Sequence, residues 1–180
     1  VGEVSYFDEN MSEEQILDKF IADDDNLSRI LNKAEKLNEV RSIRGYSADV
    51  TSLYGDKFAL LGNAGEFLDP VFSSGVTIAM HSASLAANLL DKQLSGQDVC
   101  WEKDYSVPLK KGVEVFKHFV MSWYDTKLQN IIFFQDSSSD VKPLICSILA
   151  GYAWDENNPF VKNTKRGLNI LIQICEEETV

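Results

Sequence analysis

Small and polar residues gather just before a long helical run, in the stretch FLDPVFSSGVTIAMHSASLAANLL that begins at Phe67. The first backbone N–H groups of a helix have no partner within it and carry partial positive charge. The amides of Ser74, Gly75 and Val76 can therefore face a negative or polarised group, and glycine allows a close approach. The stretch predicts a binding site at a helix start; the alternative is an ordinary buried helix with a good cap.

The residues before this helix would position it. The sequence TSLYGDKFALLGNAG predicts a hairpin whose second strand, FALLG, is apolar. Pro70 disfavours helical geometry at Asp69, so the chain must turn there. We expect a strand that ends near Gly62 and a non-helical loop over about 65–72. The helix should begin within about two residues of Ser74 and be capped by the two serines.

Helical patterns dominate the rest of the chain. SEEQ, which begins at Ser12, has the form of a capping box and starts a helix through about Ala22. Helical spacing of apolar residues predicts the others. These are a helix capped by DDDN and reaching Leu37, the helix from Ser74 to Leu94, one helix or a broken pair over Val107–Phe134, a helix capped near Ser138 or Ser139 and stopped at Gly151, and a helix from Asn158-Pro159 to about Cys175.

Strand candidates are few and lie in the first third of the chain. They are VGEVSYF at Val1, an extended segment over Val40–Val50, and the hairpin. The predicted fold class is α+β and mostly helical. An opening strand with no partner favours a fragment that has lost its N-terminal half.

Composition excludes several classes of function. Seventeen basic and 28 acidic residues give a net charge of −11, which argues against a nucleic-acid partner because phosphate contacts need clustered Lys and Arg. The sequence contains no window of about 18 uncharged apolar residues, so stable membrane insertion is not expected. Cys100, Cys146 and Cys175 are widely spaced and fit free thiols in a cytoplasmic protein, the last two in the core. No ligand spacing predicts a metal site.

Phe67, Pro70, Ser73 and Gly75 spell F-x-x-P-x-x-S-x-G. This pattern resembles the active-site motif of FAD-dependent halogenases, and LLGNAGEFLDPVFSSGVTIA is similar to the FAD-closing segment of FAD-dependent oxidoreductases with the hydroxylase-type fold. FKHFVMSWYD and ILAGYAWDENNPFV resemble the halogenase C-terminal region. The resemblance implies part of an FAD-binding α/β fold with a C-terminal helical region. Its domains would be a remnant of the substrate-side sheet with two helices (1–50), the FAD-closing segment (51–97) and a helical domain (98–180).

The resemblance also implies roles for particular residues. Gly62-Asn63 stands where the family has a Gly-Asp pair whose carboxylate contacts FAD. The amides of Ser74, Gly75 and Val76 would face the polar edge of the flavin and stabilise its reduced form, and the turn at Ser74 and Gly75 would help hold a halide. The complete implied cofactor-binding set is Gly62, Asn63, Asp69, Pro70, Ser73, Ser74, Gly75 and Val76.

Two parts of the family pattern are missing from these 180 residues. The phosphate fingerprint G-x-G-x-x-G does not occur, and the catalytic lysine of halogenases lies upstream of the matching region. No catalytic residue is therefore assigned, and we expect the chain by itself to bind FAD weakly or not at all.

Other candidate residues have a packing explanation. His81 and His118 lie within predicted helices and are expected to pack rather than to act as acid or base. Phe116, Phe119 and Trp123 follow helical spacing and predict core packing; the alternative is the wall of a pocket for a planar substrate.

The resemblance implies the C-terminal part of a flavin-dependent halogenase-like oxidoreductase acting on a small aromatic or carrier-protein-bound substrate. FAD would be its cofactor and a flavin reductase its partner. One alternative is an FAD-dependent reductase or monooxygenase of the same fold. The other is a non-catalytic helical binding module, in which SSGV only caps a helix.

Overall fold

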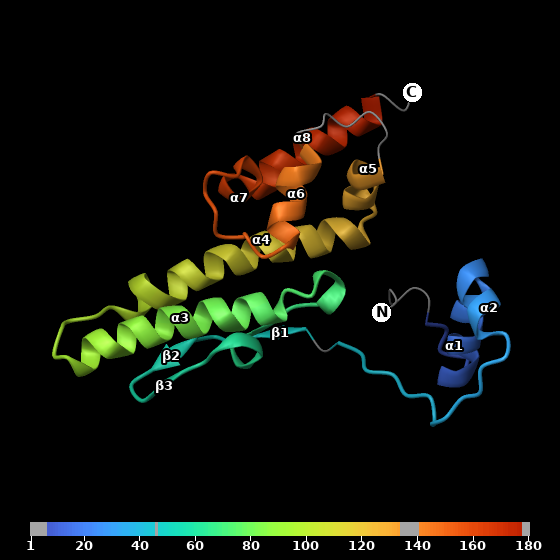
Figure 1. Ribbon diagram of the computed structural model, residues 1–180, viewed down its shortest axis with the longest axis horizontal. Helices are drawn as coiled ribbons and strands as arrows, with labels where there is room; N and C mark the ends of the chain where they lie inside the picture. Colours follow the sequence, from blue (N-terminus) through green and yellow to red (C-terminus); the bar gives the residue numbers. More distant parts are fainter. Residues whose placement is uncertain (1–6, 46, 134–140, 178–180) are drawn as a thin grey trace. The chain divides into compact units, whose positions relative to one another are not determined.

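The computed structural model describes residues 7–45, 47–133 and 141–177, and the chain divides into two units, Val1–Tyr46 and Ser47–Val180. Figure 1 labels the helices and strands. The strand predicted from Val1 lies outside the described residues, as do the caps predicted at Ser138 or Ser139. Among the described residues, no helix combines the length and the apolar character that crossing a bilayer requires.

The first unit contains two helices, α1 (Glu13–Ala22) and α2 (Asp25–Leu31). The predicted capping box is confirmed, because the Gln15 amide donates to Ser12 Oγ and the Ser12 amide donates to Gln15 Oε1. The predicted extension of the second helix to Leu37 is wrong. No residue of α2 is buried and Leu37 is 89% exposed, so the apolar spacing has no surface to pack against.

Four short strands open the second unit. They form two antiparallel pairs, β1 (Ala48–Asp49) with β4 (Glu66–Phe67) and β2 (Tyr54–Gly55) with β3 (Phe58–Ala59). The predicted hairpin is confirmed, but the predicted strand end near Gly62 is wrong because β3 stops at Ala59. Gly62 has φ of +51° and begins a 3-10 turn, η2 (Gly62–Ala64), and this conformation is incompatible with a continuing strand.

Helices make up the rest of this unit. They are α3 (Gly75–Leu94), a π-helical turn η4 (Glu102–Ser106) leading into α4 (Val107–Tyr124), α5 (Lys127–Phe133), α6 (Val141–Leu149), α7 (Pro159–Lys162) and α8 (Thr164–Glu177). Of the two arrangements predicted from residue 107 onward, one helix or a broken pair, the structure has the broken pair, with the break at Thr126, where φ is +63°. The single last helix is wrong: Asn163, with φ of −141°, separates α7 from α8.

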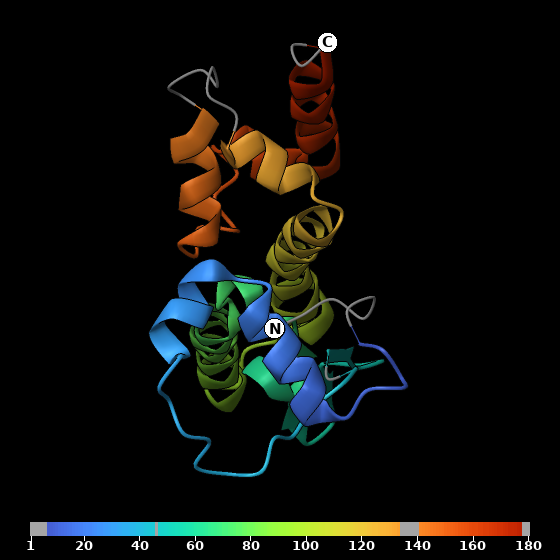
Figure 2. The same cartoon turned by 90° about the vertical axis from the view of Figure 1, so that its right-hand side faces the viewer.

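The core of the second unit forms around α3 and α4, which lie side by side (Figure 1), while the C-terminal helices gather on the other side of α4 (Figures 1 and 2). Phe116 and Phe119 are fully buried on α4, as core packing predicted. All three thiols are free, but Cys146 is exposed, so its predicted core position is wrong. Cys175 is half-buried against the core. The fold is mostly helical with short strands, as the sequence predicted.

Trp154 fixes the spacing of α3 and α4. Its ring stacks on His81 of α3 with 3.9 Å between ring centroids, and its indole N–H donates to the Pro108 carbonyl at 2.9 Å. A Cβ added to Gly112 of α4 would lie 2.0 Å from the indole, so only glycine admits the ring there. Burial lowers the pKa of His81, which fits a neutral, packed imidazole.

Candidate functional site

Helix α3 begins at Gly75, within the range predicted from the sequence. The residue before the helix, Ser74, has φ of −69° and ψ of −14°, and its side chain makes no capping hydrogen bond. The predicted serine caps are therefore wrong. A capping side chain needs an extended backbone at its own position, whereas Ser74 is already helical. Ser73, with φ of +55°, makes the left-handed turn that directs the chain into α3.

The loop before α3 is more ordered than the sequence predicted. It contains β4 and a 3-10 turn, η3 (Pro70–Phe72), so a wholly non-helical loop is wrong. Asp69 produces this turn, because its Oδ1 accepts the Val71 amide at 3.0 Å while Pro70 supplies a fixed φ at the first position. The turn closes where the Ser73 amide donates to the Pro70 carbonyl at 2.8 Å.

Helix α4 holds this loop through two aromatic side chains. The Tyr124 hydroxyl donates to Asp69 Oδ2 at 2.9 Å. The Trp123 ring meets Phe72 edge to face, with 5.6 Å between ring centroids. No local sequence pattern predicts these two contacts, because they join residues about fifty positions apart. The aromatic pattern of residues 116–128 is the one sequence signal near these contacts, and by itself it predicts a core or a pocket wall.

The Gly62-Asn63 pair lies against the first turns of α3. The Gly62 amide donates to Ser82 Oγ at 2.9 Å, and a Cβ at Gly62 would lie 2.9 Å from the Ala79 methyl. Close packing of η2 on α3 thus explains Gly62. Asn63 is exposed, and its Oδ1 would be 3.4 Å from a Cβ built on Gly75. The structure therefore brings the Asn63 amide group next to the start of α3.

The start of α3 is open. Val76 is 72% exposed and Gly75 is partly exposed, whereas Ser74 is only 3% exposed. The predicted site residues thus divide into two groups. One is accessible beside the helix start; the other is packed and supports it. The accessible group is Asn63, Pro70, Ser73, Gly75 and Val76, and the supporting group is Gly62, Asp69 and Ser74.

A buried carboxylate lies near the start of this loop. Glu66 is 2% exposed, and its Oε2 is 3.5 Å from Lys117 Nζ on α4. The same ammonium lies 3.3 Å from Asp49 Oδ2 and 3.4 Å from Glu114 Oε1. Burial raises the pKa of Glu66, and Lys117 offsets only part of that effect. The sequence analysis did not predict this cluster, because neither Glu66 nor Lys117 belongs to a recognisable motif.

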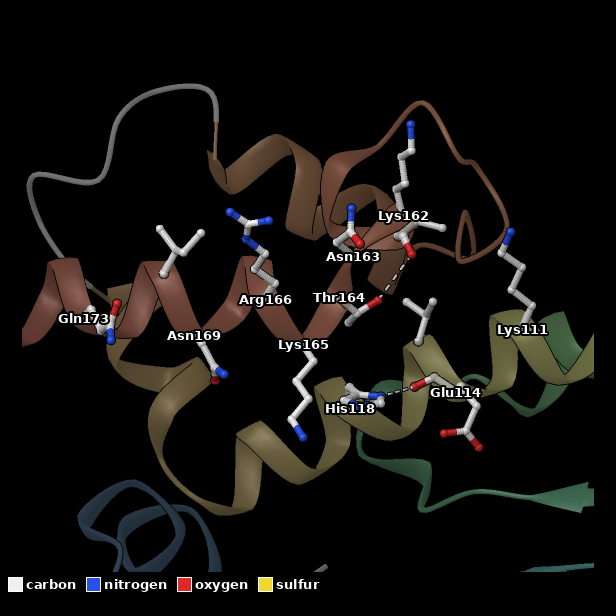
Figure 3. Close-up of a pocket in the computed structure, with 13 residues that line it drawn as sticks. Lys111, Glu114, His118, Lys162, Asn163, Thr164, Lys165, Arg166, Asn169 and Gln173 are labelled. Atoms are coloured by element: carbon white, nitrogen blue, oxygen red, sulfur yellow. Dashed lines mark hydrogen bonds between the residues drawn. The ribbon is translucent and has the colours of Figure 1, made fainter.

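A groove in the second unit lies elsewhere, between α4 and α8 (Figure 3). Its lining includes Lys111, Lys162, Lys165 and Arg166, but these cations do not converge. In Figure 3, Lys165 points toward α4, whereas Lys162 and Arg166 point to the other side of α8. Lys111 is paired with Glu156, and His118 Nδ1 contacts the Glu114 carbonyl at 2.7 Å. The groove therefore presents dispersed charges rather than a formed site.

No protein-family model matches the chain. A 1H-pyrrole-2-carbonyl-(peptidyl-carrier protein) chlorinase of Pseudomonas fluorescens is 25% identical over 73% of the chain and 30% of its own length. A flavin-dependent halogenase of Penicillium aethiopicum is 34% identical over 59% of the chain and 20% of its own length. A solved flavoprotein/dehydrogenase from Cytophaga hutchinsonii is 42% identical, with a TM-score of 0.90, over 99% of the chain and 44% of its own.

The fold and the loop–helix segment therefore define a helical part of a flavin halogenase-type fold. The chain is similar to flavin-dependent halogenases and to a flavoprotein/dehydrogenase, which confirms the resemblance carried by the F-x-x-P-x-x-S-x-G motif. It spans less than half the length of each of these proteins.

Proposed function

We propose that these residues form the C-terminal part of an FAD-dependent halogenase-like oxidoreductase, with the start of α3 against the flavin. The observation that carries the proposal is the open helix start. Gly75 offers its backbone without a side chain, Val76 follows on an exposed surface, and the Asn63 amide group lies beside them. An uncapped helix N-terminus favours the electron-rich edge of a flat, polar ring.

The residues of this chain would bind and orient the flavin. The Gly75 and Val76 amides would donate to the ring edge and stabilise negative charge there. The Asn63 side chain would contact the polar part of the cofactor, in the position of the family's carboxylate. Asp69 would act indirectly, since its two oxygens accept from Val71 and Tyr124. The halide would lie at the Ser74–Gly75 turn and be held by the Gly75 backbone amide, since the Ser74 side chain is buried.

Bound reduced flavin supplies the electrons for activating dioxygen, and a flavin reductase partner would deliver them. We assign no residue of this chain to the chemical step. The substrate would be a small aromatic group, free or attached to a carrier protein, because the relative from Pseudomonas fluorescens acts on a pyrrole group carried by a peptidyl-carrier protein. We further propose a cytoplasmic location and retain the predicted division at 1–50, 51–97 and 98–180.

The name of the solved relative favours a second candidate of the same class. That protein is called a flavoprotein/dehydrogenase, and it aligns with nearly the whole chain. An FAD-dependent reductase or monooxygenase would use the same helix start to hold the flavin, but it would need no halide at the Ser74–Gly75 turn. A helical binding module without a cofactor is the third candidate.

One experiment separates the three candidates. The full-length protein is purified, and any released flavin is identified as FAD or FMN by chromatography. The holoprotein is then supplied with reduced flavin, oxygen, bromide or chloride, and pyrrole-2-carbonyl carrier protein. Halogen isotope patterns in the product support halogenation. A hydroxylated or reduced product favours the second candidate. If the protein retains no flavin after reconstitution with FAD, the binding module without a cofactor is favoured.

A further inference from the structure

Helix α4 contacts the segment Glu66–Phe72 at three places, and all three contacting side chains come from one part of that helix. Lys117 pairs with Glu66, Trp123 packs on Phe72, and Tyr124 donates to Asp69. Lys117 and Tyr124 are seven residues apart, so they lie on the same face of α4. The loop that leads into α3 thus follows the surface of a rigid helix.

Asp69 is the central residue of this arrangement. Its Oδ1 accepts the Val71 amide and creates the η3 turn, and its Oδ2 accepts the Tyr124 hydroxyl. Asp69 and Tyr124 are both half-buried, which strengthens the hydrogen bond relative to an exposed one. Directly after η3, Ser73 and Ser74 set the direction of the first turn of α3.

We infer that Tyr124 is a positioning residue for the helix start that the proposed function places against the flavin. It acts through Asp69: the hydroxyl fixes the carboxylate, the carboxylate fixes η3, and η3 fixes the direction in which the Gly75 and Val76 amides point. A site held by a residue on a rigid helix keeps its geometry better than a free loop does. This inference rests on the proposed function for the identity of the ligand, but not for the contact itself.

The test compares Tyr124→Phe with Tyr152→Phe in the full-length protein. Both changes remove one phenolic hydroxyl, and Tyr152 is 63% exposed, on the segment between α6 and α7. Hydrogen exchange of the amides over residues 71–76 is measured without flavin, and FAD affinity and the flavin absorption spectrum are measured on reconstitution. Tyr124→Phe should accelerate exchange and weaken FAD binding, each roughly two- to tenfold, as expected for the loss of one hydrogen bond. The flavin spectrum should also shift.

The control should match the wild-type protein in all three measurements. A double variant supplies a second check: Tyr124→Phe added to Asp69→Ala should weaken FAD binding no further, because both act through one contact. The positioning role would be overturned if Tyr124→Phe left the hydrogen exchange, the FAD affinity and the flavin spectrum unchanged. If Tyr124→Phe accelerates exchange but the wild-type protein itself binds no flavin, the contact with Asp69 is supported and the proposed function is overturned.

Discussion

The loop before α3 and the groove between α4 and α8 contain polar groups of similar kinds, yet they are organised in opposite ways. In the loop, the Asp69 carboxylate accepts two hydrogen bonds and the Gly62 amide donates to a buried hydroxyl. In the groove, Lys165 points toward α4, whereas Lys162 and Arg166, also exposed, point to the other side of α8. The loop also contains most of the motif F-x-x-P-x-x-S-x-G, on which the sequence resemblance to halogenases rests. Converging and supported polar groups, rather than the number of charges, therefore distinguish the candidate site.

The largest expected effect concerns how much of a flavin site this segment provides. Residues 1–180 lack G-x-G-x-x-G, which would bind the pyrophosphate of FAD. We therefore expect the 180-residue chain by itself to show no FAD binding at micromolar concentration in isothermal titration, whereas the full-length protein binds it. A micromolar or tighter site on the chain alone would mean that the loop suffices for binding.

The next prediction compares two lysines, one supporting the loop and one in the groove. Lys117→Met would leave Glu66 buried without its cation and should lower the free energy of unfolding by about 3–5 kcal/mol at neutral pH. Lys111→Met, which breaks an exposed pair with Glu156, should cost about 1 kcal/mol or less. Denaturant unfolding of both variants measures the difference, and equal losses would contradict the distinction between the two regions.

The loss in Lys117→Met should depend on pH in a defined direction. Burial raises the pKa of Glu66 in the folded protein above its ordinary value of 4.5. The stability contributed by Glu66 is therefore fully present below 4.5 and falls as the pH rises through the folded-state pKa. Removing Lys117 should thus cost little at low pH, where Glu66 is protonated, and progressively more toward neutrality. The Glu66→Gln background should remove the part of this pH dependence that comes from Glu66.

Two glycines, one at the start of α3 and one in the core, are expected to respond differently to an added side chain. Gly75→Val should reduce flavin content at least tenfold, roughly 1.4 kcal/mol, because the side chain would stand where the ring approaches the helix amides. The fold should tolerate this change, since an added Cβ meets only Asn63 Oδ1, at 3.4 Å. Gly112→Val should instead destabilise the fold by about 1–3 kcal/mol or more through overpacking against Trp154. Flavin absorbance and thermal unfolding separate the two effects; wild-type flavin content in Gly75→Val would remove Gly75 from the site.

The smallest effect is expected in the groove. Lys165→Ala and Arg166→Ala change exposed side chains at the start of α8 and should alter the free energy of unfolding by no more than about 0.5 kcal/mol. Flavin content should match the wild-type protein. A marked loss of flavin in either variant would show that the groove takes part in the site and would break the comparison.

Local sequence determined the elements whose causes lie within a few residues. The start of α3 was predicted to within one residue. Asp69-Pro70 prevents the helix from starting earlier, and Ser73-Ser74-Gly75 allows it to start there. The capping box of α1 and the hairpin of β2 and β3 followed in the same way. The F-x-x-P-x-x-S-x-G motif placed the candidate site in a single segment, so its position and the resemblance to halogenases were both available from the sequence.

Tertiary packing determines which residues of the candidate site face outward and which support them. Gly62 is required by the Ala79 methyl of α3, the Ser74 side chain is buried instead of capping, and Asp69 is held by Tyr124, 55 positions away. Glu66 is likewise buried against a lysine of another helix. No local pattern encodes such contacts, because each depends on how two elements distant in the chain pack together. Spacing along a helix defines a face, but the partner of that face is set by the fold.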